Sequence, residues 1–148
     1  MKTPLIIAIS SACVAAALAI APPAQAKSYI FSFAGKTAVC LMGAEGGKAD
    51  AVCDVSNPSF KAPPTPSSCQ NALWGDRITM VEGGKPTWQC HTDTLTTLSY
   101  EIPGPDATEV NGSIACVAVD NDGTKCRDTS TGNFFIFSPT SYQLSPPA

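Results

Sequence analysis

Charged side chains are scarce in this sequence, and those present do not cluster. Only 14% of the 148 residues are Asp, Glu, Lys or Arg, with nine basic against twelve acidic residues and a net charge of −3. The basic residues are scattered and form no stripe. Proteins that bind nucleic acid or an anionic membrane surface concentrate Lys and Arg on one face. We therefore expect neither of these partners.

The usual motifs of enzymes and metal sites are also missing. The chain has one histidine, no C-x-x-C pair and no G-x-S-x-G, and "GAEGGK" lacks the P-loop spacing. Zinc sites built from Cys and His are therefore not expected. The loop "DNDG" does not fit an EF-hand, because placing Gly123 at position 6 puts Ala118 at position 1 and Thr129 at position 12. We expect no catalytic residue, cofactor or metal.

One short stretch, "CHTD" at residues 90–93, resembles catalytic machinery. A nucleophile beside an imidazole and a carboxylate can be activated. Adjacent residues on a strand point to opposite faces, however, so Cys90 and His91 are not expected to meet. A triad of His91, Asp93 and a serine could still assemble in space. A small secreted hydrolase using His91 and Asp93 is therefore the alternative function.

Long apolar runs are absent except near the N-terminus, at residues 5–20. Lys2 precedes this run, and "PPAQA" follows it with the small residues that signal peptidase requires. The run is too short and wrongly flanked for a transmembrane helix. We expect residues 1–26 to be a secretory signal. Residues 27–148 would then form one exported domain without a stable membrane span.

Cysteine is plentiful for a chain of this size. Cys13 lies in the expected signal, which leaves an even number in the exported domain. An even cysteine count in an exported chain predicts disulfides, here three. The six residues are Cys40, Cys53, Cys69, Cys90, Cys116 and Cys126.

Helix signals are nearly absent from residues 27–148, and short β-rich runs alternate with Gly and Pro, which predicts an all-β fold. Three segments share a glycine, a β-run, a Gly-bearing turn and a cysteine, and their cysteines Cys53, Cys90 and Cys126 are 37 and 36 residues apart. Three units of about four strands predict a β-trefoil-like barrel, with a β-sandwich as the alternative. The aromatic core candidates are Phe31, Phe33, Trp74, Trp88, Tyr100 and residues 134–137.

The repeat also predicts the disulfide pairs. In the first and third units, cysteines occupy two successive β-runs, and a hairpin would place them opposite each other. In the second unit Met80 takes the first of these positions, so Cys90 is left to pair with Cys69. The predicted pairs are Cys40–Cys53, Cys69–Cys90 and Cys116–Cys126. The stretch "CVAVDNDGTKC" is then a stapled turn, because Asn, Asp and Gly tolerate left-handed backbone.

Several stretches resemble a known group of proteins: "GKTAVCL", "AVCDV", "FKAPPTPSSC", "WGDRI", "WQCHTDT" and "GSIACVAVDNDGTKCRDTSTGNFFIFS". They are similar to small secreted actinobacterial proteins of unknown function, common in mycobacteria. The most specific part is C…G-x-x-C…T-G-x-x-F, formed by Cys116, Gly123, Cys126, Thr131, Gly132 and Phe135. This chain has "TGNFF" where those proteins usually have "TGHGF". The resemblance implies export and a disulfide-held domain, and supplies no catalytic residue.

The favoured function is an exported, non-catalytic domain of the cell envelope. It would bind a glycan or a protein partner, or have a structural role in the envelope. Exposed Trp74 or Trp88 would be the ligand-binding side chains, whereas full burial of both would assign them to the core.

Overall fold

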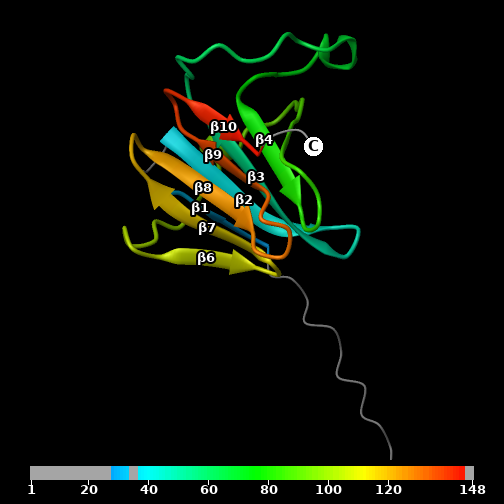
Figure 1. The fold of residues 1–148 in the computed structure, drawn as a ribbon. Coiled ribbons are helices and arrows are strands. Elements are labelled where there is room, and N and C mark those ends of the chain that lie inside the picture. The colour runs from blue at the N-terminus through cyan, green and yellow to red at the C-terminus, as the bar shows by residue number, and fades with distance from the viewer. Residues whose placement is uncertain (1–27, 34–36, 146–148) are drawn as a thin grey trace, which may run out of the picture.

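The computed structural model describes residues 28–33 and 37–145, which form two five-stranded antiparallel sheets (Figure 1). The first sheet contains β1 (Tyr29–Phe31), β2 (Ala38–Glu45), β3 (Lys48–Val55), β4 (Arg77–Val81) and β5 (Thr87–Trp88) in that order. The second contains β6 (Thr108–Asn111), β7 (Ile114–Val119), β8 (Gly123–Asp128), β9 (Phe134–Phe137) and β10 (Tyr142–Leu144), also in chain order. The 3-10 helices η2 (Ser67–Cys69) and η3 (Leu95–Thr97) lie in connections between strands. The expected signal, residues 1–26 with Cys13, lies outside the described residues.

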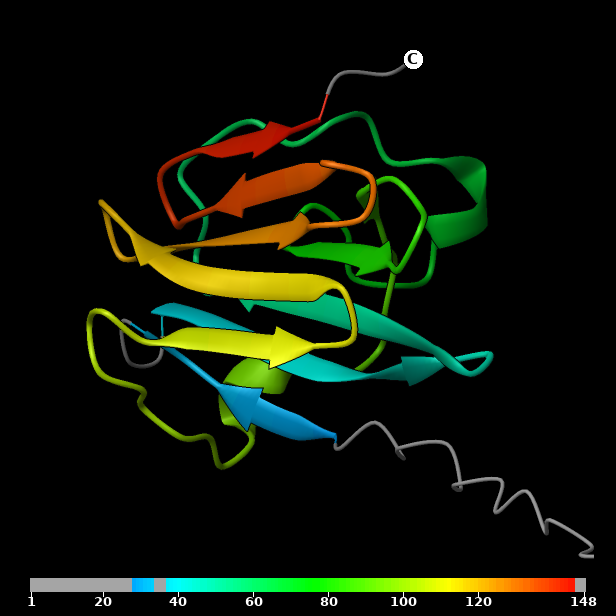
Figure 2. The same ribbon diagram turned by 60° about the horizontal axis from the view of Figure 1, so that its bottom comes forward.

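The two sheets face each other as the layers of a sandwich (Figure 2). Near one edge, the Asn111 amide on β6 donates a hydrogen bond to the carbonyl of Gly43 on β2. At the opposite edge, the Trp88 ring on β5 lies 4.9 Å from the Tyr142 ring on β10. The all-β prediction is confirmed. The sandwich alternative fits, and the described residues form no closed, trefoil-like barrel.

The second segment of the sequence repeat does not build a unit of its own. Its strands β4 and β5 continue the first sheet, and β4 pairs with β3 from Asp50↔Val81 to Asp54↔Arg77. Residues 89–107 contain isolated bridges and η3 but no strand. The observed repetition is therefore twofold, with two meanders of five strands. The threefold spacing of the cysteines misled because short β-rich runs do not specify the strands with which they pair.

The core lies between the sheets and is centred on two disulfides. Cys40–Cys53 joins β2 to β3 and Cys116–Cys126 joins β7 to β8, with Cα–Cα distances of 4.1 and 4.0 Å between directly opposed residues. The sulfur atoms of Cys40, Cys53 and Cys126 lie within 4.8 Å of one another, so the two disulfides meet across the sandwich. The largest fully buried apolar side chains that cluster with them are Phe31, Met42, Ile78, Met80, Ile114, Phe135 and Phe137.

The third predicted pair also forms. Cys69 in η2 is bonded to Cys90 just after β5, with a Cα–Cα distance of 5.6 Å. The turn between β7 and β8 has the predicted left-handed residues, Asn121 at φ 61° and Asp122 at φ 56°. The sequence therefore predicted all three pairs and the stapled turn.

A buried carboxylate joins the hairpin ends of the two sheets. Asp128, fully buried at the end of β8, accepts hydrogen bonds from the Gly83 amide after β4 at 2.6 Å and from Ser113 Oγ at 2.8 Å. The Ser130 amide and hydroxyl also donate to it, at 2.8 and 2.6 Å. Burial alone would raise the pKa of Asp128, but the hydrogen bonds from Ser130, Gly83 and Ser113 outweigh it and hold the pKa below the usual value. This carboxylate therefore remains ionised and fixes the two sheets to each other.

Candidate functional site

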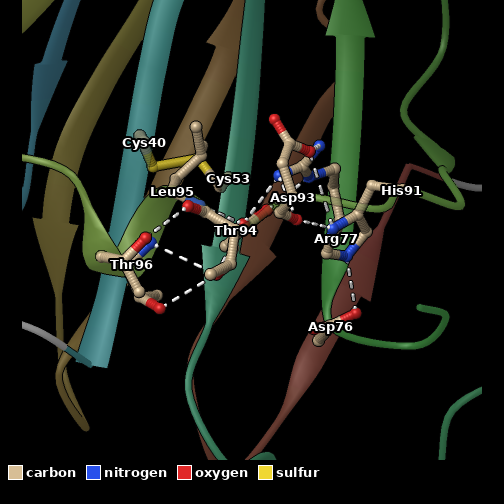
Figure 3. A network of polar contacts seen from close by, with 11 residues as sticks. Cys40, Cys53, Asp76, Arg77, His91, Asp93, Thr94, Leu95 and Thr96 are labelled. Carbon is tan, nitrogen blue, oxygen red and sulfur yellow. Dashed lines mark hydrogen bonds and ion pairs between the residues drawn. A yellow bond between two sulfur atoms is a disulfide. The ribbon is translucent and has the colours of Figure 1, made fainter. Parts of the chain in front are cut away.

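His91 and Asp93, the residues of the alternative hydrolase function, lie in a polar network at the start of β4 (Figure 3). The Arg77 guanidinium donates to both carboxylate oxygens of Asp54 on β3, at 2.6 and 2.9 Å, and to Asp93 Oδ1 at 3.1 Å. The Leu95 amide donates to Asp54 at 2.8 Å. Burial lowers the pKa of Arg77, but its bonds to Asp54 and Asp93 raise it more, so the net pKa lies above the usual value. Arg77 is therefore a fixed cation that anchors the 93–95 segment to the sheet.

The imidazole of His91 is enclosed by the same network. Its side chain is only 2% exposed, and Nε2 lies 2.9 Å from Asp76 Oδ1. Nδ1 contacts the backbone carbonyl of Asp93. The backbone of His91 forms a bridge with Leu73, which holds the residue in place. Both ring nitrogens are thus occupied by fixed neighbours.

The polar groups of this network bond one another and hold the 91–95 segment against β4. A general base needs a ring nitrogen that can reach a substrate proton, and His91 has neither nitrogen free. The Asp93 carboxylate is bonded to Arg77, which lowers its pKa. Cys90 is bonded to Cys69 and offers no thiol. The structure therefore brings His91 and Asp93 together, with both ring nitrogens of His91 and the Asp93 carboxylate in contact with neighbours in the same chain.

A second candidate is an apolar groove at the open edge of the sandwich. It lies where the outer strands β5 and β10 approach each other, beside the connection between β3 and β4, and its volume is about 570 Å³. The residues that line it are Pro63, Lys85, Pro86, Thr87, Trp88, Tyr142, Gln143, Leu144 and Ser145. Ligand sites are typically apolar concavities of this size with a few polar groups.

Aromatic packing holds the wall of the groove in place. The Trp88 and Tyr142 rings are nearly perpendicular, and Trp88 also lies 5.8 Å from the buried Phe137 ring. Phe60 packs edge-to-face on Tyr142 at 5.1 Å. Trp88 and Tyr142 are both half-buried, so each keeps part of its surface open to solvent. Such rings combine an apolar face with a polar tip, which suits them to binding.

The two tryptophans have different roles. Trp74 lies behind the groove, 6.2 Å from Trp88, and its indole N–H donates to the Pro63 carbonyl at 2.9 Å. It therefore holds Pro63, one of the residues that line the groove, whereas Trp88 lines the groove itself. Tyr142 was missed at the sequence level. The alternation Tyr-Gln-Leu in "SYQLS" indicates a strand, but nothing local indicates that this strand faces β5.

Charge in the groove comes from Lys85. Of the described residues that line the groove, Lys85 alone is ionic, and its side chain is exposed. The chain as a whole carries a net charge of −3, so the groove differs in sign from the rest of the molecule. A ligand with an anionic group would be favoured here.

The cysteine sulfur cluster is not a metal site. The atoms of Cys40, Cys53 and Cys126 that lie close together are disulfide sulfurs, which are not thiolate ligands. Among the described residues, no helix has the length and apolar character needed to cross a membrane. Three disulfides are typical of an oxidising compartment outside the cytosol.

No family model, curated protein or solved structure matches this chain. The similarity to secreted actinobacterial proteins is therefore a prediction that these comparisons leave untested.

Proposed function

We propose that this protein is an exported, non-catalytic binding domain that holds a cell-envelope partner in the groove between β5 and β10. The observation that carries the proposal is the half-exposed aromatic pair Trp88 and Tyr142 in a preformed apolar groove. Preformed sites lose little conformational entropy on binding, because their side chains are already ordered. The network around His91 supports the non-catalytic part, since its polar groups bond to one another.

Export supports a partner in the envelope. The N-terminal sequence is typical of a secretory signal, and the three disulfides fit an oxidising compartment. A glycan or a protein could both use an aromatic surface, and the groove has polar groups at its rim in Thr87, Gln143 and Ser145.

Retention on isolated envelope material from the source organism tests the proposal. We expect Trp88→Ala to lower retention of the oxidised domain about tenfold, because it removes a large apolar contact surface. Ile102→Ala is the matched control, since Ile102 is 67% exposed and follows Glu101, which pairs with β1 at the other edge. Thr87→Arg places a long side chain in the groove without removing a core contact. It should also lower retention, and it keeps the test valid if truncation of Trp88 destabilises the fold. Equal retention of folded Trp88→Ala, Thr87→Arg and parent protein would refute the proposal.

A further inference from the structure

The outer edge of β10 has backbone groups directed away from its sheet. Hydrogen bonds run from the Ser138 amide to the Ser141 carbonyl, and from the Ser145 amide to the Phe134 carbonyl. In an antiparallel pair, residues alternate between bonding the neighbouring strand and facing away from it. The register is constant from Tyr142↔Phe137 to Leu144↔Phe135. Residues 141, 143 and 145 therefore bond β9, and the N–H and C=O groups of Tyr142 and Leu144 point to the free edge.

The other outer strands are less open than β10. The backbone of β1 is bonded to Glu101 on its outer side. β5 has two residues and follows Pro86, which has no amide proton. The Val110 carbonyl of β6 accepts a hydrogen bond from the Tyr29 hydroxyl at 3.5 Å. β10 is also short, with three residues, but it contains no proline, lysine or bulge that would block pairing with a further strand.

The outward N–H and C=O groups of Tyr142 and Leu144 bond no other described residue, and they border the same groove that Trp88 and Tyr142 line. Tyr142 and Leu144 are opposite the buried Phe137 and Phe135, so their side chains lie on the inward face at the open edge of the sandwich. A ligand in the groove thus meets both aromatic surface and backbone donors and acceptors. Outward-facing groups recur every second residue, about 7 Å apart. An extended peptide reproduces this spacing of N–H and C=O groups along its whole length, and a sugar ring does not.

We propose that the occupant of the groove is an extended peptide segment of a partner protein, which adds to β10 as a further strand. Its backbone bonds Tyr142 and Leu144, an apolar side chain contacts Trp88, and an acidic group lies within reach of Lys85. Backbone bonds then give affinity, while the groove and Lys85 select the sequence. This inference rests on the function proposed above and names its partner.

A library of linear twelve-residue peptides displayed on phage, selected on the disulfide-intact domain, is the probe. We expect enriched peptides to share an apolar residue and an acidic residue. Lys85→Glu should weaken the binding of a synthetic enriched peptide about tenfold at low salt. On binding, hydrogen exchange at the amides of Tyr142 and Leu144 should slow, whereas the Gln143 amide is already bonded and should change little.

Two substitutions of Leu144 isolate the backbone contribution. Leu144→Pro and Leu144→Ala both remove the leucine side chain, but only proline also removes the outward amide proton, and edge strands tolerate such a proline. We expect Leu144→Pro to bind the peptide about tenfold more weakly than Leu144→Ala, with both folded by near-ultraviolet circular dichroism. Equal binding by the two variants, or selection of no peptide, would overturn the inference.

Failure of the strand-addition inference and failure of the proposed function give different results. Envelope retention that depends on Trp88, survives protease treatment of the envelope material and is equal in the two Leu144 variants would leave the groove as a glycan site and refute strand addition. Equal retention of folded Trp88→Ala and the parent protein would refute the proposed function itself.

Discussion

Substitution of Asp128 tests whether one buried carboxylate holds the two sheets together. Its Oδ2 accepts the Gly83 amide, and its Oδ1 accepts Ser113 and both groups of Ser130. Asp128→Asn can keep the three bonds to one oxygen, but turns its amide group toward the Gly83 N–H, so two donors face each other. A hydrogen bond to a charged group contributes about 1.5–3 kcal/mol. We therefore expect Asp128→Asn to lower the free energy of unfolding by about 2 kcal/mol.

Asp128→Ala should lower the free energy of unfolding by about 4 kcal/mol, which is less than the sum of four such bonds. Gly83 and Ser130 are exposed, so water replaces part of what they lose. Urea unfolding with the disulfides intact, at pH 7, measures both values. Asp122→Asn is the control, because Asp122 is exposed in the turn between β7 and β8, and asparagine tolerates its positive φ.

The pH dependence gives this prediction a second test. The folded pKa of Asp128 lies below the unfolded value of about 3.9, so its contribution is complete above that pH and is lost as the pH falls toward the folded value. At pH 3 the parent protein should have lost about 1 kcal/mol through this group, whereas Asp128→Asn loses none. The difference in unfolding free energy between the two proteins should therefore shrink at pH 3. A difference that is absent at pH 7, or that grows on acidification, would refute the reasoning.

Three further perturbations have expected outcomes. Arg77→Ala leaves Asp54 as a buried, uncompensated charge and should lower the unfolding free energy by about 3–5 kcal/mol in the same urea assay; a loss below 1 kcal/mol would contradict this. Replacing Cys116 and Cys126 together by alanine should cost about 3 kcal/mol for a closed loop of this length, and an unchanged urea midpoint would argue against that value. Burial raises the pKa of Tyr29 to about 12, so the difference in ultraviolet titration between the parent and Tyr29→Phe should show at most about a tenth of this residue as phenolate below pH 11.

The parts of the fold that sequence could predict are local. Cys40 and Cys53 lie on two β-runs separated by "EGGK", and both glycines of this turn have positive φ, which a tight hairpin needs. The same reasoning paired Cys116 with Cys126. The assignment of Cys69 to Cys90 followed by elimination, and needed no knowledge of the tertiary fold.

The groove and the ion pair depend on contacts that no local pattern records. Trp88 and Tyr142 meet because β5 and β10 are the last strands of their respective sheets. The Asp54 and Arg77 side chains meet through the register of β3 and β4 across a long connection. In the sequence, both charges resemble ordinary surface residues of a β-run.

The order of the disulfides along the chain bears on how the molecule matures. The cysteines of the described domain pair in sequence order, first with second, third with fourth and fifth with sixth, so no two of the three loops overlap. A chain that is translocated N-terminus first presents Cys40 and Cys53 before any later cysteine has emerged. Oxidation in order of emergence then joins the native partners one pair at a time, and thiol–disulfide reshuffling is not needed to reach the native set.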